Sequence, residues 1–441
     1  MLYQGNMKQN SPLLYLKIIL SIFFILIISY NFYVANNFKY EADGDAASFI
    51  GLGVSLVKLQ KYGHINFPEG GGLINVFKEN KISNGEFHFC GHSTWRPPVW
   101  PFLMAGIFLV FGYNLIYVLV FKFLLHLLGV FIFYKALKLL KLKEVLIIIG
   151  AFLYGISPAW QLYSRVFLSE PVTLFFITLW MYLLIRFIQN KSGFLPQAFL
   201  GGILVLSHPY NIFLPFSVWL ILLIRKQLNL KVFLFSSLIC ASLISVWIVR
   251  NFIVLKTDQV VLTTSSGAVM AKGWNSEVLK KHTNTKGDLA DEDLVLKEYK
   301  YDENIGYNEV QRMQLYKDAT LNFIRLNPDL ILPIISKKLL SAFNPFPETP
   351  KPGVLETGRW LFQLLALLSL IYILFFSRNK LIQSLAIGLI LSAIGITILT
   401  YSGFRFRMPQ VGLELLFIVF VIDDVLTRRA EEKTVNRKLK R

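Results

Sequence analysis

Apolar runs recur along almost the whole chain, separated by short polar turns. An α-helix rises about 1.5 Å per residue, so about 20 apolar residues are needed to cross the hydrocarbon core of a bilayer. The pattern therefore predicts an all-α polytopic membrane protein with about ten transmembrane helices. The runs lie at residues 13–34, 97–112, 113–134, 144–160, 167–185, 196–208, 210–224, 231–254, 359–377, 381–400 and 408–426.

Basic residues concentrate in the short turns between these runs. Short loops rich in Lys and Arg stay on the cytoplasmic side of a membrane. The distribution predicts that both termini are cytoplasmic. The basic segments are 135–143, 186–191, 225–231, 378–380 and the tail after residue 426.

The run 97–112 does not fit a full crossing. It begins after Arg96-Pro97-Pro98 and contains Pro101. If every run crossed, the two termini would lie on opposite sides and the basic turns would no longer share one side. We expect 97–112 to be a juxtamembrane helix on the outer face. The short runs 196–208 and 210–224 are expected to form a hairpin broken at Pro209.

Two long polar loops, 35–96 and 255–358, then lie on the outer side. They contain 20 of the 27 acidic residues, whereas the net charge of the chain is +18. The basic excess is thus mainly a topology signal, and no basic stripe on a folded soluble face supports nucleic-acid binding. The sequence predicts three parts: an N-terminal transmembrane module 1–254, a large outer loop or small helical cap 255–358, and C-terminal transmembrane helices with a basic tail, 359–441.

Candidate chemistry begins in the first outer loop. Asp43 and Asp45 precede a predicted interfacial helix that starts near Ala46. Either carboxylate is a candidate general base. The alternative is that both only cap this helix, because Asp is common at helix N-termini.

Five arginines at outer helix ends depart from the cytoplasmic preference of basic residues. One guanidinium group can donate two parallel hydrogen bonds to a phosphate, so we favour a shared site for an anionic phosphate. For any single arginine, snorkelling toward lipid headgroups is the alternative. The five are Arg96, Arg165, Arg250, Arg405 and Arg407.

Two further groups of polar residues have competing interpretations. Lys122 and His126 share one face of a predicted membrane helix, and we favour an interior position bonded to neighbouring backbone. His88, Cys90 and His92 alternate along a segment and could provide three zinc ligands, but no fourth ligand is evident. No cofactor is required by the sequence, and a divalent metal stays an open alternative.

Several short motifs follow one another in a recognisable order, and together they resemble the GT-C glycosyltransferases that use polyprenyl-phosphate sugars. This superfamily includes the dolichyl-phosphate-mannose protein mannosyltransferases and the lipid A aminoarabinose transferase. The motifs are Asp45 with Phe49, Arg96-Pro97-Pro98, Ser169-Glu170, Trp247 to Asn251, Thr263–Gly267, Gly273-Trp274-Asn275 and Arg405 to Pro409.

The resemblance implies an enzyme of the cell envelope that moves a sugar from a polyprenyl-phosphate carrier to a glycan, lipid or protein acceptor at the outer face, with inversion of the sugar. By the same resemblance, Asp45 is the base, with Asp43 nearby, and the five arginines bind the donor phosphate. Glu170 and His208 are expected to orient the acceptor, and Glu170 could also hold an arginine in place. The alternative for Glu170 is a purely structural pair with Arg165.

The sequence departs from the family at two positions. Many relatives have a second acidic residue directly after the base, whereas here Ala46 follows, and Ser207-His208-Pro209 replaces a common Thr-Arg-Pro. Two other functions stay open: an outer-face polysaccharide polymerase, and a lipid flippase or transporter. The sugar, the acceptor and the carrier length do not follow from the sequence.

Overall fold

The structure is a computed structural model, and it is almost entirely helical. It describes residues 14, 17–26, 29, 44–66, 77, 87–190, 193–280, 291–297, 307–344, 354–401 and 404–439. The main bundle contains α6 (Leu115–Leu139), α7 (Glu144–Gly155), α9 (Glu170–Asn190), α10 (Phe194–Ser207), α11 (Leu214–Ile224), α12 (Leu230–Leu255), α16 (Val354–Phe375), α17 (Lys380–Leu399) and α19 (Val411–Leu439).

Five helices in the described part of the chain are long and apolar enough to cross a membrane. Shorter apolar helices supplement them, including residues 17–26, α7 and α10. The all-α polytopic membrane fold is therefore confirmed, whereas the count of ten crossings stays a prediction. The five long segments are Leu115–Leu139, Glu170–Asn190, Leu230–Leu255, Thr357–Phe375 and Lys380–Leu399.

The bundle is held by one large apolar core. Trp180 and Met181 of α9, Trp219 of α11 and Phe417 of α19 are fully buried in it. The expected break at Pro209 is present, because α10 ends at Ser207 and a short 3-10 turn, Pro209–Asn211, precedes α11. Proline has no N–H to continue the helix, so the chain turns back at this position.

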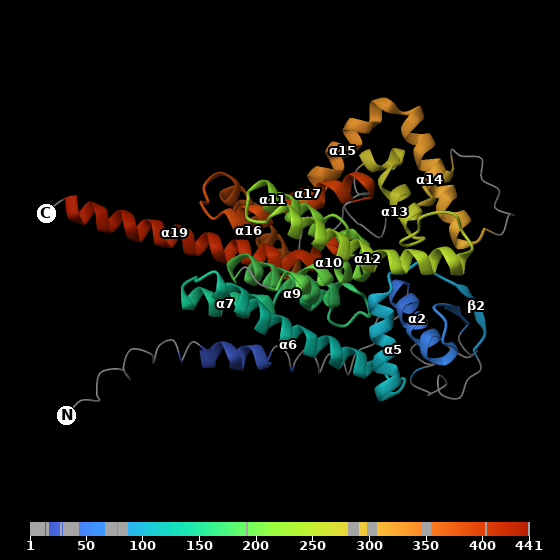
Figure 1. The fold of residues 1–441 in the computed structure, drawn as a ribbon, viewed down its shortest axis with the longest axis horizontal. Helices are drawn as coiled ribbons and strands as arrows, with labels where there is room; N and C mark the ends of the chain where they lie inside the picture. The colour runs from blue at the N-terminus through green and yellow to red at the C-terminus, as the bar shows by residue number, and fades with distance from the viewer. Residues whose placement is uncertain are drawn as a thin grey trace.

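The elements of the two long polar loops, which the sequence analysis places on the outer side, gather at one end of the bundle, on the right of Figure 1. The first loop supplies α2 (Asp45–Leu59) and an antiparallel pair, β1 (Gly63–Ile65) with β2 (Phe89–His92), in which Gly63 faces His92. The second supplies α13 (Ser266–Gly273), α14 (Glu309–Leu326), α15 (Pro328–Phe343) and the 3-10 turns Ser276–Leu279 and Asp293–Leu296.

Helix α5 (Val99–Phe111) is the juxtamembrane helix expected from 97–112. With 13 residues it is about 20 Å long, too short to cross the hydrocarbon core. It runs across the long bundle helices at their right-hand end in Figure 1 and packs against α2. The remaining elements are α8 (Pro158–Tyr163), α18 (Phe404–Arg407) and the 3-10 turn Met408–Gln410.

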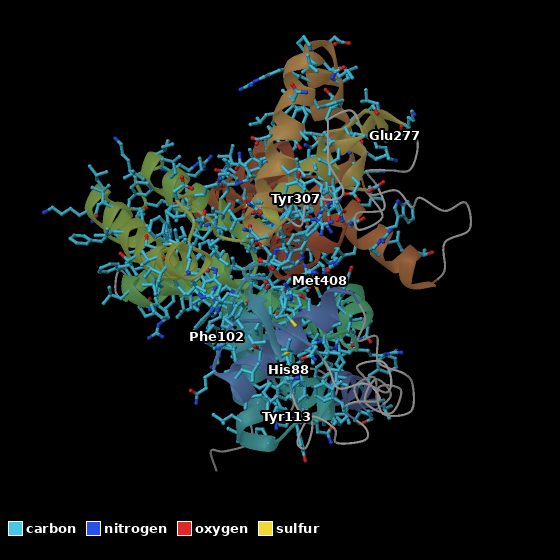
Figure 2. All side chains as sticks on the ribbon, turned by 90° about the vertical axis from the view of Figure 1, so that its right-hand side faces the viewer. His88, Phe102, Tyr113, Glu277, Tyr307 and Met408 are labelled. Carbon is cyan, nitrogen blue, oxygen red and sulfur yellow. The ribbon has the colours of Figure 1, made fainter. Side chains whose placement is uncertain are left out.

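Figure 2 looks onto this end of the molecule. The helices marked by Glu277 and Tyr307 lie above, and the part marked by His88, Phe102 and Tyr113 lies below, with Met408 between them. The helices of the second outer loop have their own small core, which includes Trp274, Tyr316 and Phe323. The meeting point of these two parts positions the candidate site.

Candidate active site

Asp45 lies between two arginines that come from distant parts of the chain. Its Oδ1 accepts a hydrogen bond from Nη2 of Arg96, and its Oδ2 lies 2.7 Å from Nη2 of Arg405. Arg96 precedes α5, whereas Arg405 belongs to α18 before the last helix. The structure thus brings together three of the residues that the sequence singled out.

The position of Asp45 does not depend on capping by its side chain. The N-cap of α2 is Gly44, and the helix start has no side-chain capping hydrogen bond. Gly44 has φ 55° and ψ −121°, a conformation open essentially to glycine alone. This turn directs the first helical residue, Asp45, toward the arginines.

Arg405 also contacts a second carboxylate. Its Nε donates to Oε1 of Glu170, which is fully buried at the first position of α9. The sequence analysis left open whether Glu170 orients the acceptor, holds an arginine in place or only pairs with Arg165. In the structure Glu170 fixes Arg405, because a buried carboxylate needs a paired cation.

The charges around Asp45 determine its protonation. Burial alone would raise the pKa of this carboxyl group, but the positive charges of Arg96 and Arg405 and their hydrogen bonds outweigh burial. The pKa of Asp45 therefore lies below its ordinary value, and the side chain is ionised at neutral pH. A third of its side chain stays accessible, at 31% exposure.

These residues line a cavity of about 670 Å³ between the bundle and the outer helices. Asp45, Arg96 and Arg405 lie on its wall with His208, and α13 and α14 contribute Lys272 and Lys317. The size is within the range of small-molecule sites. Further wall residues are aromatic: Phe49, Trp95, Tyr210, Tyr401 and Phe406.

The aromatic rings of the wall pack on one another. Tyr210 and Phe406 stack with ring centroids 5.2 Å apart, and Tyr401 meets Phe406 edge-on at 5.0 Å. His208 approaches the same ring at 5.7 Å. The sequence analysis did not select these three aromatic residues, because nothing in an apolar segment distinguishes an aromatic side chain of a cavity wall from one of the core.

The other three candidate arginines do not lie on the cavity wall. Arg250 donates to the backbone oxygens of Tyr62 and Ser93 and lies over the Trp247 ring. Arg407 turns away from Arg405 and pairs with Glu414 of α19.

Arg165 also lies off the wall, and its buried Nε has no hydrogen-bond partner in the described part of the chain. The shared site of five arginines is thus reduced to Arg96 and Arg405.

The remaining predicted groups have simple outcomes. Asp43 lies outside the described residues. His92 lies on β2 with Cys90, and no cluster of three or more His, Cys, Asp or Glu side chains suited to a metal occurs in the described ranges. The zinc alternative for His88, Cys90 and His92 therefore has no structural support.

Lys122 and His126 face the interior, as favoured from the sequence. Nζ of Lys122 donates to the backbone oxygens of Tyr163 and Ser164, at 3.0 and 3.1 Å, and to that of Val166. Nε2 of His126 lies 2.9 Å from the Gly155 oxygen, and its ring stacks on Trp160. Both residues therefore hold turns of the bundle together.

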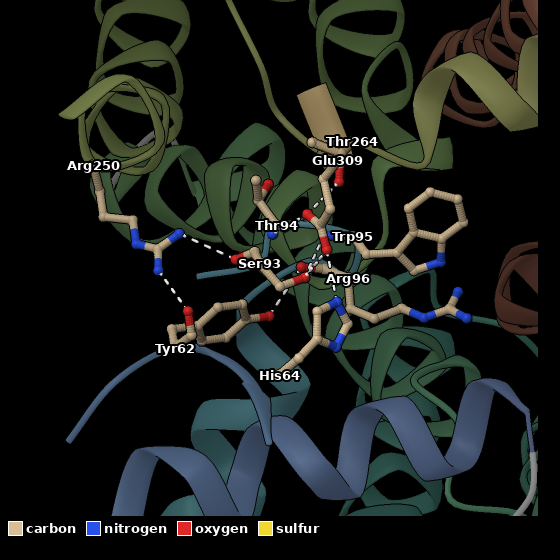
Figure 3. Close-up of polar contacts among 9 residues, drawn as sticks. All are labelled: Tyr62, His64, Ser93, Thr94, Trp95, Arg96, Arg250, Thr264 and Glu309. Atoms are coloured by element: carbon tan, nitrogen blue, oxygen red, sulfur yellow. Dashed lines mark hydrogen bonds and ion pairs between the residues drawn. The ribbon is translucent and has the colours of Figure 1, made fainter. Parts of the chain in front are cut away.

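A partly buried carboxylate near the cavity was not recognised from the sequence. Figure 3 shows Glu309 at the start of α14, facing the segment that leads into Arg96. A helix start gives no sign that its first carboxylate contacts a distant loop.

One known family matches part of the chain. Residues 95–249 match the family described as Dolichyl-phosphate-mannose-protein mannosyltransferase. The matched segment, about a third of the chain, includes Arg96, Glu170 and His208.

Two solved structures are similar to this chain. They are crystal structures of ArnT from Cupriavidus metallidurans, one bound to undecaprenyl phosphate and one in the apo state. The first is 12% identical and the second 11%, each with a TM-score of 0.37, and each comparison covers 90% of this chain and 77% of the other. A comparison with curated protein sequences gives no match.

Proposed function

We propose that the protein transfers a sugar from a polyprenyl-phosphate carrier to an acceptor at the outer face of the membrane, with inversion at the anomeric carbon. The observation that carries this proposal is the position of Asp45 between Arg96 and Arg405 on a cavity wall. One carboxylate and two guanidinium groups provide a base and an anion site within one side-chain length of each other.

Arg96 and Arg405 bind the donor phosphate. When the bond between the anomeric carbon and the phosphate oxygen breaks, that oxygen gains negative charge. Fixed cations stabilise this charge, and no general acid is needed because a phosphate leaving group is stable as an anion. Glu170 orients Arg405 from behind, because it contacts Nε and leaves Nη2 directed at Asp45.

Asp45 accepts the proton of the acceptor hydroxyl or amine while the acceptor atom bonds to the anomeric carbon. A phosphate competes with Asp45 for the same two guanidinium groups. Donor binding therefore removes part of the charge that holds the pKa of Asp45 low, and the carboxylate becomes a stronger base. Attack from the side opposite the phosphate inverts the sugar.

The outer-face location rests on the positions of charge. The basic turns lie between the bundle helices, whereas the acidic outer loops supply α2 and α13–α15 next to the cavity. We propose that residues 255–358 select the acceptor, because this part contributes Thr263, Ser266 and Lys272 to the cavity wall. His208, on the opposite wall, contacts the sugar or the acceptor.

Purified protein tests the proposal directly. Transfer of a radiolabelled sugar from a panel of polyprenyl-phosphate donors is measured for wild type, Asp45→Asn and the exposed-site control Asp329→Asn. We expect wild type and the control to be active and Asp45→Asn to lose at least about 100-fold, the lower end of typical general-base contributions. Undiminished transfer by Asp45→Asn would contradict the role of the base. No transfer by wild type with any donor would favour a polymerase or a flippase.

A further inference from the structure

The Glu309 carboxylate makes four polar contacts, three of them to elements outside its own helix and loop. Its Oε1 accepts a hydrogen bond from Oγ of Ser93 at 2.6 Å and lies 2.7 Å from Nε2 of His64. Its Oε2 accepts from the backbone N–H of Thr94 at 3.0 Å and from Oγ1 of Thr264 at 2.8 Å. Figure 3 shows these groups converging on one side chain.

The Glu309 carboxylate is mostly hidden from solvent, since its side chain is 18% exposed, whereas His64 is half exposed. Burial alone would raise its pKa, but the contact with His64 and the hydrogen bonds from Ser93, Thr94 and Thr264 lower the pKa below its ordinary value. An ionised carboxylate accepts all of these bonds, whereas a neutral amide of the same size cannot, because half of its polar atoms are donors. The cluster is therefore built for a carboxylate.

The segment that Glu309 contacts leads directly into the donor-binding arginine. Thr94 is two residues before Arg96, and Trp95 between them lies on the cavity wall. The same segment is fixed from other sides: the hydroxyl of Tyr62 donates to the Arg96 oxygen at 2.9 Å, and Asn251 donates to Oγ1 of Thr94. Glu309 is a charged contact to this segment from α14; Trp95 also packs against the core of the same helices, and the Thr264 N–H donates to the Thr94 oxygen at 3.1 Å.

We propose that Glu309 is a positioning residue that couples the outer helices α13–α15 to Arg96. It does not touch the cavity itself, so it acts through the Ser93–Arg96 segment. A phosphate site depends on the placement of its cations to within a fraction of an ångström. Helices α13 and α14 also line the part of the cavity proposed to bind the acceptor. The contact of Glu309 with the Ser93–Arg96 segment therefore links the acceptor side of the site to the donor-binding Arg96. This inference rests on the proposed function for its effect on donor binding.

The experiment compares Glu309→Ala, Glu309→Gln and a matched control, Asp329→Ala. Asp329 is an exposed carboxylate in the first turn of the neighbouring helix α15. Its removal therefore also takes a negative charge away from a helix N-terminus, but at an exposed position. Two quantities are measured: hydrogen exchange of the backbone amides of residues 93–96, and the affinity for a polyprenyl monophosphate in detergent micelles. Thr264→Val, which removes one of the hydrogen bonds to Glu309, is a milder variant if Glu309→Ala does not fold.

For Glu309→Ala we expect the exchange rate of the Thr94 amide to rise at least tenfold and the affinity for the polyprenyl monophosphate to fall at least tenfold. The control Asp329→Ala should change neither quantity. Glu309→Gln should recover part of both. Combined with Arg96→Ala, Glu309→Ala should cause no further loss of affinity, since a residue that acts through Arg96 has nothing left to position. A purely structural role would give additive losses and would overturn the proposal.

The exchange measurement separates this inference from the proposed function. If exchange rises in Glu309→Ala but Arg96→Ala binds the monophosphate as well as wild type, then the donor site is misassigned and only the coupling stands. If exchange at Thr94 and affinity are both unchanged in Glu309→Ala, Glu309 does not position the segment and the inference fails.

Discussion

Arg405 and Glu170 lie 235 positions apart in the sequence, yet Nε of the arginine donates to a carboxylate that is fully buried. The same guanidinium reaches Asp45 through Nη2. Arg405 therefore joins the start of α9 to the start of α2. Both the stability of the fold and the geometry of the site depend on this residue.

Replacement of Glu170 by Gln should destabilise the protein. Removal of one partner of a buried ion pair leaves the other charge uncompensated and typically costs about 3–5 kcal/mol. We expect a large drop in the thermal midpoint in detergent, together with a loss of transfer activity. Glu144→Gln is the control: Glu144 also starts a helix, but its pair with Lys17 is exposed, so its loss should change stability little.

Replacement of Arg405 by Lys should keep the positive charge but lose the simultaneous contacts with Asp45 and Glu170. An ammonium group cannot contact Asp45 and Glu170 from two fixed edges as the planar guanidinium does. We expect kcat/KM to fall by about 100-fold, as positioning errors of this kind allow. Arg428→Lys alters an exposed pair with Asp424 and should leave activity unchanged. Equal activities of the two variants would contradict the role of Arg405.

Gly44→Ala should impair both folding and activity. The added Cβ meets no atom within 4 Å, so the effect would come from the backbone alone, whose φ of +55° is unfavourable for alanine. Such strain costs about 1–3 kcal/mol, or is relieved by moving Asp45. Gly106→Ala, within helix α5 and also without close neighbours, should be neutral or stabilising. Denaturation and transfer assays on both variants test the difference.

Lys122→Met should destabilise the turn between α8 and α9. The ammonium group satisfies three backbone oxygens, and each buried acceptor that loses its donor costs about 1–3 kcal/mol. Lys135→Met, on an exposed face of the same helix α6, is the control and should change stability little. Thermal unfolding of the two variants is the measurement, and equal midpoints would show that Lys122 is not needed for this turn.

The ion pairs of Asp45 should make stability depend on pH in the acid range. Because the folded pKa lies below the ordinary value of 3.8, Asp45 contributes stability that is complete above 3.8 and is lost as the pH falls through the folded pKa. The difference in thermal midpoint between wild type and Asp45→Asn should be constant from pH 7 to about 4 and shrink below that. A difference that already shrinks at pH 6 would contradict the lowered pKa.

The sequence predicted the helices well because their signals are local. The prolines before 97–112 and at Pro209 set a helix start and a break that the structure confirms. Local signals of this kind do not determine which way a side chain at a helix end points. Arg405 and Arg407 are two residues apart, yet they turn to Glu170 and to Glu414 respectively.

The directions of these side chains depend on interaction partners that lie far away along the chain. Arg250 was a further phosphate-binding candidate from the sequence, but its guanidinium group lies over the rings of Tyr62 and Trp247 instead. Glu309 was missed for the same reason, since its partners are 45 to 245 positions away. Neither composition nor periodicity contains that information.

The placement of Arg405 beside Asp45 has a consequence for biosynthesis. Asp45, Arg96 and Glu170 are translated early, whereas Arg405 emerges only with the final helix α19. Until then the nascent chain has two carboxylates facing a space where their shared cation is missing. The corner of the bundle where α2 meets α9 should therefore take its final form only after α18 has been inserted.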